Sequence, residues 1–386
     1  MSIEETMPMR LHGRASVSEF LNDFIVYRGL NPTDQRLPKL SDLLSQSNLP
    51  AHQIPRKHEK EYAQVVVTLL RQAHKIAAPG SVLKRLIFVG DTRMSDVGAF
   101  QNLCLAGLWD GLVFIGSENS RPEAAERIQL EISQKLFLAN RWRLLEEFNQ
   151  FRLEEKFPID ESTVVVLDLD KTILGGRGRN SGVIDQARVQ AVRQTVASLL
   201  GDAFDPVAFQ ITYNQLNQPE YHPFTTDNQD YLAYICLLLG CGIEKLEDLI
   251  QRIQTHRLQS FEQFIQQIDE KKAGLPVSLA EFHQDIYRLV QAGDPTPFKV
   301  FRRNEYQITA SHMGCLPDDA LITDILSKEI VITQEVRQLA IDWKSQGAML
   351  FGLSDKPDEA SLPTAALRAE GWLPLHQIPT HIVGQG

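Results

Sequence analysis

Cysteine is scarce in this sequence. Only four cysteines occur in 386 residues, and no two of them form a CxxC pair. Neither a zinc site nor a disulfide framework is therefore indicated, because both need several cysteines at suitable spacing. A reducing, cytoplasmic location fits this cysteine usage best.

Long hydrophobic runs and an excess of positive charge are also missing. The longest apolar stretch, around 231–243, is too short to span a bilayer, and the first 14 residues lack the apolar segment of a secretory signal. The 39 Lys and Arg residues are outnumbered by 49 Asp and Glu residues, which gives a net charge of −10. We therefore expect neither a membrane nor a nucleic acid as partner, and an anionic substrate would need a local cluster of positive charge.

The apolar content suffices for one large domain or two smaller ones. Hydrophobic residues make up 43% of the chain and charged residues 23%, which is ordinary for a globular protein. Short apolar runs of strand type occur at 86–89, 112–115, 164–167, 348–353 and 381–383.

Helical patterns alternate with these runs. Apolar spacing predicts a helix within 59–77 and one long amphipathic helix over 121–156. A helix over 16–27 is the main feature of an N-terminal extension, 1–55. Strand signals are scarce over 184–347, which indicates a large helical insertion. Strands alternating with helices elsewhere predict an α/β domain with a parallel sheet.

The most informative stretch is TVVVLDLDKT, residues 163–172. Its continuous apolar run is typical of a central strand that is buried on both faces. Asp168 and Asp170 follow at the carboxyl end of that strand, where open α/β sheets bind ligands. One carboxylate can attack an electrophile while the other transfers a proton, provided that a cation offsets their repulsion. The alternative is an acidic turn that only ends a strand.

This stretch resembles the first motif of the haloacid dehalogenase superfamily, DxDx(T/V), with Thr172 in the last place. The resemblance implies that Asp168 is the nucleophile and Asp170 the general acid and base. It also places Thr172 near the phosphate. An acid at position 170 is typical of the superfamily's phosphatases and phosphomutases rather than its dehalogenases.

Two further strand ends resemble later motifs of the superfamily. Ser354 follows the run 348–353, as in the second motif, where it would hold phosphate oxygens; the alternative is a serine that caps a helix. The segment VGDTRMSD resembles the fourth motif. Asp91 would then share Mg²⁺ with Asp168 and the backbone carbonyl of Asp170, and Asp96 would bind it directly or through water. An acid-capped helix start is the alternative here.

Basic residues complete the predicted site. Lys57 precedes the helix that leads to strand 86–89, so it resembles the cation of the third motif, although Arg56 and Lys60 are alternatives. In the loop after Thr172, Arg177 and Arg179 add positive charge that would attract an anionic substrate. A solvated loop with no such role is equally compatible with the sequence.

The order of these motifs differs from that of the superfamily, in which the nucleophile motif comes first. Too few residues follow Ser354 for the third and fourth motifs, and both are found upstream instead. The resemblance therefore implies a circularly permuted, doubly wound, Rossmann-like core, formed by 56–174 and 346–386, with a helical cap at 175–345. The expected strand order is 112–115, 86–89, 164–167, 348–353, 381–383.

The function that this resemblance implies is Mg²⁺-dependent hydrolysis of a small phosphorylated metabolite through an aspartyl-phosphate. A phosphomutase would use the same residues, and a non-catalytic protein that binds a phosphorylated ligand is an alternative from another class. The sequence does not identify the substrate or the oligomeric state.

Overall fold

The computed structural model describes residues 8–44, 54–57 and 59–385. The chain divides into two units. Unit 1 contains Pro55–Gln186 and Thr309–Gly386 together with the N-terminal residues, and unit 2 is formed mainly by Ala187–Ile308. Unit 2 is thus smaller than the cap expected at 175–345, because residues on both sides of it pack in unit 1.

Unit 1 is built on a seven-stranded sheet with the order β2-β9-β7-β3-β4-β6-β5. All neighbours run parallel except β5 and β6, which are antiparallel. The strands are β2 (Ile25–Val26), β3 (Arg85–Gly90), β4 (Asp110–Gly116), β5 (Ala125–Glu131), β6 (Gln134–Ala139), β7 (Thr163–Asp168) and β9 (Met349–Leu353). The predicted α/β class is confirmed, and so is the order of β4, β3, β7 and β9.

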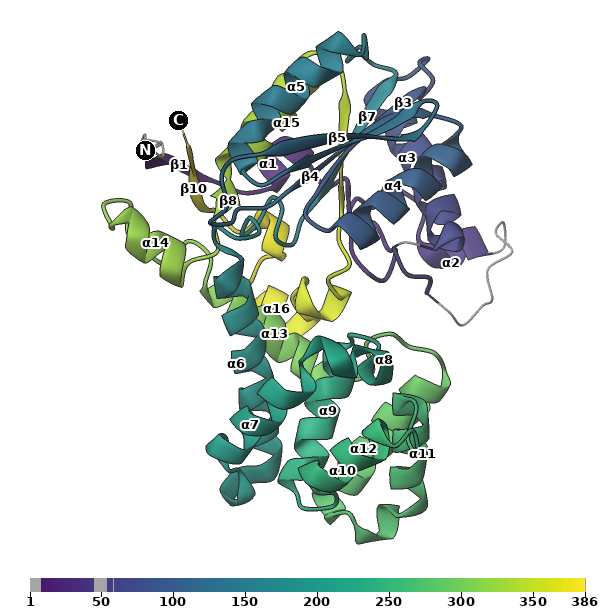
Figure 1. Ribbon diagram of the computed structural model, residues 1–386, viewed down its shortest axis with the longest axis vertical. Helices are drawn as coiled ribbons and strands as arrows, with labels where there is room; N and C mark the ends of the chain where they lie inside the picture. The colour runs from purple at the N-terminus through teal and green to yellow at the C-terminus, as the bar shows by residue number, and fades with distance from the viewer. Residues whose placement is uncertain (1–7, 45–53, 58, 386) are drawn as a thin grey trace. The chain divides into compact units, whose positions relative to one another are not determined.

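Helices cover both faces of this sheet (Figure 1). On one face lie α3 (Lys60–Ala77) and α4 (Arg93–Gly107), and on the other α1 (Ser18–Leu21), α5 (Leu145–Glu154) and α15 (Gln334–Ser345). Every residue of β7 is buried because it lies between these two layers. The remaining helices of unit 1 are short: α2 (Leu40–Leu44), α14 (Ile322–Lys328) and α16 (Ala365–Ala369).

The last position of the predicted strand order was wrong. The run 381–383 forms β10 (Thr380–Gln385), but β10 belongs to a separate sheet with the order β1-β10-β8. The place beside β9 is taken by β2, whose two residues are too few to give a strand signal. The N-terminal residues are therefore part of unit 1, where they supply β1 (Met9–Ala15) and β2, so the predicted helical extension was wrong. Of the helix predicted at 16–27, only α1 forms.

The long helix predicted over 121–156 was also wrong. That segment forms the antiparallel hairpin β5–β6, a short 3₁₀ turn at Trp142–Leu144, and only then α5. β5 is an exposed edge strand with charged side chains, so its sequence resembles the polar face of a helix. β6 is parallel to β4 and extends the sheet.

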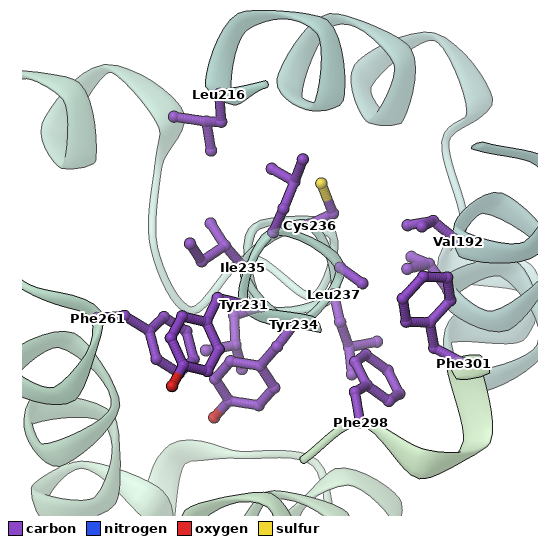
Figure 2. Close-up of a cluster of buried hydrophobic side chains, with 14 of the residues drawn as sticks. Val192, Leu216, Tyr231, Tyr234, Ile235, Cys236, Leu237, Phe261, Phe298 and Phe301 are labelled. Carbon is purple, nitrogen blue, oxygen red and sulfur yellow. The ribbon is translucent and has the colours of Figure 1, made fainter. Parts of the chain in front are cut away.

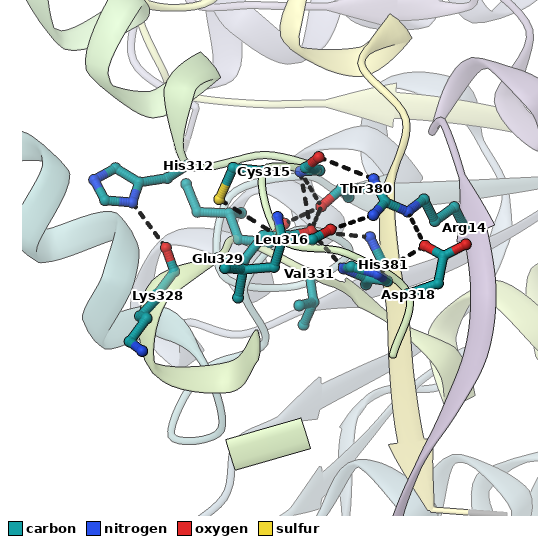
Figure 3. Close-up of polar contacts among 12 residues, drawn as sticks. Arg14, His312, Cys315, Leu316, Asp318, Lys328, Glu329, Val331, Thr380 and His381 are labelled. Atoms are coloured by element: carbon teal, nitrogen blue, oxygen red, sulfur yellow. Dashed lines mark hydrogen bonds and ion pairs between the residues drawn. The ribbon is translucent and has the colours of Figure 1, made fainter. Parts of the chain in front are cut away.

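The small sheet of β1, β10 and β8 (Ile332–Thr333) is tied to the segment 312–331 by a polar cluster that is largely buried (Figure 3). Glu329 is fully buried and accepts hydrogen bonds from His381 Nδ1 (2.8 Å) and Thr380 Oγ1 (2.9 Å). Asp318 pairs with Arg14 Nε at 2.5 Å. This pairing gives Asp318 a structural role.

Unit 2 is helical. Its elements are most of α6 (Ser181–Leu200), α7 (Pro206–Leu216), α8 (His222–Thr225), α9 (Gln229–Gly240), α10 (Leu246–Gln254), α11 (Phe261–Glu270), α12 (Val277–Gln291) and most of α13 (Lys299–Ser311), since the start of α6 and the end of α13 belong to unit 1. The apolar α9 lies in the centre of its core (Figure 2), where Tyr231 stacks on Phe261 with ring centroids 3.8 Å apart. Among the helices that the structure describes, none has the length and apolar character needed to cross a membrane.

Candidate active site

Three neighbouring strands of the large sheet end at the same edge, and each carries a polar residue there. Asp168 is the last residue of β7, Asp91 follows β3, and Ser354 follows β9. The register pairs Val89 with Leu167 and Asp168 with Leu353. Because these strands are parallel and in register, the three polar residues meet at the carboxyl edge of the sheet, where α/β folds bind ligands.

Three carboxylates converge at this edge. Asp91, Asp96 and Asp168 are buried, and each offers one oxygen within 4.8 Å of the others. Burial raises the pKa of the Asp168 carboxyl well above its ordinary value, Lys57 opposes this shift, and the two other acids add to it. Burial also raises the pKa of Asp91, which Arg177 opposes. The site therefore holds more negative charge than its surroundings stabilise, as a site for a cation would.

Asp96 holds the loop between β3 and α4. Its Oδ2 accepts hydrogen bonds from the backbone N–H groups of Asp91 (3.0 Å) and Thr92 (2.9 Å), and its Oδ1 pairs with Lys57 Nζ at 2.7 Å. This close approach requires glycine at position 90, where a Cβ would collide with the Asp96 carboxylate. Both oxygens of Asp96 therefore have partners, so this residue positions its neighbours.

Lys57 is the cation that contacts the predicted nucleophile. Its Nζ lies 2.5 Å from Asp168 Oδ1, and the side chain is only 2% exposed. Burial lowers the pKa of this ammonium, but the charges of Asp168 and Asp96 raise it well above its ordinary value. Arg56 and Lys60, the alternatives that the sequence left open, are both exposed.

Thr172 contacts Asp168, and Ser354 follows Leu353, the residue that pairs with Asp168 in the sheet. Thr172 is fully buried, and its hydroxyl donates to Asp168 Oδ2 at 3.1 Å, so it orients the carboxylate rather than facing a phosphate. Ser354 is buried, and its Oγ accepts from the backbone N–H of Lys356 at 3.1 Å. Its hydroxyl proton can still donate, so the capping and phosphate-binding interpretations are compatible.

Asp170, the predicted acid and base, is more accessible than Asp168. Its side chain is 26% exposed, and its Oδ1 lies 3.9 Å from Lys356 Nζ. Lys356 follows Ser354 by two residues and was not identified from the sequence, although its place in a strand-end loop was a usable signal. The two residues form an accessible acid with a cation near it.

The basic loop behaves differently from what was predicted. Arg177 Nε pairs with Asp91 Oδ2, and Arg177 NH2 donates to Thr92 Oγ1 at 3.1 Å. Arg179 is almost fully buried and pairs with Glu118 and Glu335, both at 2.7 Å. The prediction that Arg179 meets an anionic substrate was therefore wrong, because two acids from distant segments already neutralise it. Arg177 remains at the site, as a partner of Asp91.

Comparison with known proteins adds nothing to this geometry, since no family model, curated protein or solved structure matches the chain.

Proposed function

We propose that this chain is a Mg²⁺-dependent phosphohydrolase of the haloacid dehalogenase type, with its core motifs in circularly permuted order. One observation carries the proposal: Lys57, 111 positions before Asp168, pairs with it at the sheet edge where Asp91 and Ser354 also lie. The resemblance requires this convergence, although the segments occur in an unusual order. The mainly helical unit 2 lies between Asp170 and Ser354 in sequence, where that superfamily carries its first type of cap.

The donor set suits Mg²⁺. Asp168, Asp91 and the backbone carbonyl of Asp170 would hold it, and oxygen is the ligand that this ion prefers. When bound, Mg²⁺ supplies positive charge to the phosphoryl oxygens and to the two carboxylates. Asp96 acts in this arrangement by holding Asp91 and Lys57.

The proposed reaction has two steps. A carboxylate oxygen of Asp168 attacks phosphorus, the bond from phosphorus to the ester oxygen breaks, and Asp170 gives that oxygen a proton. Water then attacks the aspartyl-phosphate while Asp170 takes a proton from it, which releases phosphate and restores Asp168. Lys57 and the Ser354 hydroxyl stabilise charge on the transferred group, and Thr172 keeps Asp168 in position.

The direct test is a single-turnover assay with a panel of phosphomonoesters. A phosphatase releases inorganic phosphate, a phosphomutase returns a moved phosphate, and a non-catalytic binder gives neither. Asp168→Asn is expected to abolish turnover and phosphoenzyme formation while the fold is retained. Residual activity within about tenfold of wild type, roughly 1.4 kcal/mol in barrier, would exclude Asp168 as the nucleophile.

Dependence on Mg²⁺ gives a second test. Asp91→Asn is expected to weaken Mg²⁺ activation strongly, because it removes one of two carboxylate ligands. Asp318→Asn is the matched control, since Asp318 lies in the structural cluster with Arg14. Equal effects of the two substitutions would contradict the assignment of Asp91.

A further inference from the structure

A small pocket in unit 1 opens beside Asp170 and Ser354. Its walls are mostly aliphatic and include Leu174, Met313 and Leu375. The cavity volume is ≈ 20 Å³, which exceeds the roughly 10–15 Å³ that a single water needs. A pocket of this size accepts a short carbon chain but excludes a sugar ring or a nucleobase.

Besides Tyr27, Asp170 and Ser354, two polar side chains line this pocket, Thr309 and Lys356. Thr309 is 4% exposed, and its hydroxyl has no hydrogen-bond partner among the described residues. Lys356 is 8% exposed and places its ammonium 3.9 Å from Asp170 Oδ1. A buried hydroxyl without a partner costs about 1–3 kcal/mol of free energy. A ligand that supplies a hydrogen-bond partner for it therefore gains that free energy on binding.

We infer that this pocket receives the leaving group of the phosphomonoester and selects a short carbon chain that carries one hydrogen-bond acceptor. The inference rests on the proposed function, because Asp170 must lie next to the ester oxygen that it protonates. Lys356 only donates hydrogen bonds, and the Thr309 hydroxyl can donate one. A carbonyl oxygen on the leaving group therefore suits both residues, whereas the several hydroxyls of a sugar would lose their water against the aliphatic walls.

A matched pair of esters tests this selectivity. 2-Oxopropyl phosphate and isobutyl phosphate have leaving groups of similar shape, but only the first carries a carbonyl oxygen. Wild type is expected to show a kcat/KM for 2-oxopropyl phosphate that exceeds that for isobutyl phosphate by more than about fivefold, since the neutral hydrogen bond from Thr309 alone contributes that factor. Glucose 6-phosphate, whose leaving group exceeds the cavity, is expected to be the poorest of the three.

Substitutions at Thr309 separate the hydroxyl from its packing. Thr309→Val keeps the shape and removes the hydroxyl, so the preference for 2-oxopropyl phosphate is expected to fall by about fivefold. Thr309→Ser keeps the hydroxyl and is expected to retain the preference. If Thr309→Val leaves the preference unchanged, or if glucose 6-phosphate is used as well as the short esters, the inference is overturned.

Binding keeps this test independent of catalysis. The three phosphates are titrated calorimetrically into Asp168→Asn protein, with and without Thr309→Val. The same order of affinities with no turnover in wild type would reject the proposed hydrolysis but support the pocket. Turnover of all three esters with no order in either kcat/KM or affinity would support hydrolysis and reject the pocket.

Discussion

Lys57 is the residue on which the charge balance of the site depends. Its ammonium lies 2.5 Å from Asp168 and 2.7 Å from Asp96, and it stands 5.4 Å from the centre of the Phe88 ring. Water has almost no access to it, so its two ion pairs are only weakly screened. Removing one member of a buried ion pair is costly because its partner is left charged and buried.

Lys57→Met is therefore expected to lower the free energy of unfolding by about 3 kcal/mol in the absence of divalent cations. Urea denaturation in EDTA measures this loss, and added Mg²⁺ is expected to reduce it. Lys60→Met is the control, since Lys60 begins the neighbouring helix α3 but is exposed. Similar losses in the two variants would show that Lys57 acts only through packing or helix formation.

Arg177 is expected to affect Mg²⁺ affinity, because its partner Asp91 is a proposed Mg²⁺ ligand. The loop holds its backbone in place, as its N–H donates to the Lys171 carbonyl at 2.7 Å. The side chain is 41% exposed, so its ion pair is worth less than about 1 kcal/mol.

Arg177→Gln is expected to tighten Mg²⁺ binding by about three- to fivefold in calorimetric titration. Arg143→Gln, an equally exposed arginine paired with Glu123, is the control. Weaker binding by Arg177→Gln would show that Arg177 supports the ion rather than competing with it.

The residues that could be predicted from the sequence share one property. Asp168, Asp91 and Ser354 each come directly at the end of a continuous apolar run, so their position at the sheet edge follows from the strand. Arg179 could not be predicted in this way, because the direction of its side chain depends on Glu118 and Glu335, which lie 61 and 156 positions away in the sequence. Thr309 was missed because nothing in its helix distinguishes it from a structural threonine.

At the scale of elements, the predictable strands are the central ones. β3, β7 and β9 are buried almost throughout, which gives the unbroken apolar runs that identify them. The edge strands could not be predicted from the sequence, since β2 has only two residues and β5 is exposed and charged. β10 carries a clear strand signal, but its sheet is chosen by pairing with β1, which a local pattern does not encode.

The end of β2 is joined to a later segment through a buried histidine. Tyr27 follows β2, and its hydroxyl lies 3.1 Å from His376 Nδ1, in the turn Leu375–Gln377. Burial lowers the pKa of His376 from 6.5 to about 4, against the opposing charge of Asp23. The folded protein therefore resists protonation that the unfolded chain accepts between these two pH values.

The contribution of His376 to the free energy of unfolding is thus expected to be fully present above pH 6.5 and to be lost as the pH falls towards 4. At 1.36 kcal/mol for each unit of pKa shift, this histidine contributes up to about 3 kcal/mol. Urea denaturation of wild type and His376→Gln over this range isolates its part, because the other titrating groups are shared. The difference between the two proteins is expected to shrink by that amount as the pH falls. A constant difference would show that His376 has the same pKa in the folded and unfolded states.

At the scale of the whole chain, the proposed permutation is the feature with the widest consequence. The strand order β4-β3-β7-β9 is independent of where the chain is cut, so the motifs can meet whichever of them comes first. β1 and β10 pair antiparallel, with Met9 opposite Gln385. A short linker can therefore join these two ends of unit 1 with little strain.

The chain is then expected to fold when it is reopened before β7, which places the Asp168 motif first. A suitable opening lies between Glu155 and Lys156, which are exposed and follow the end of α5. Because every strand pairing is retained, we expect a cooperative unfolding transition close to that of wild type, by circular dichroism. Calorimetry is expected to show that Asp91→Asn weakens Mg²⁺ binding in the reopened chain as it does in the original.

A second chain, opened between Val165 and Val166 inside β7, is the control and is expected not to fold. If both openings abolish folding, the core requires the present order of its segments, and retaining the strand pairings is not sufficient for it to fold.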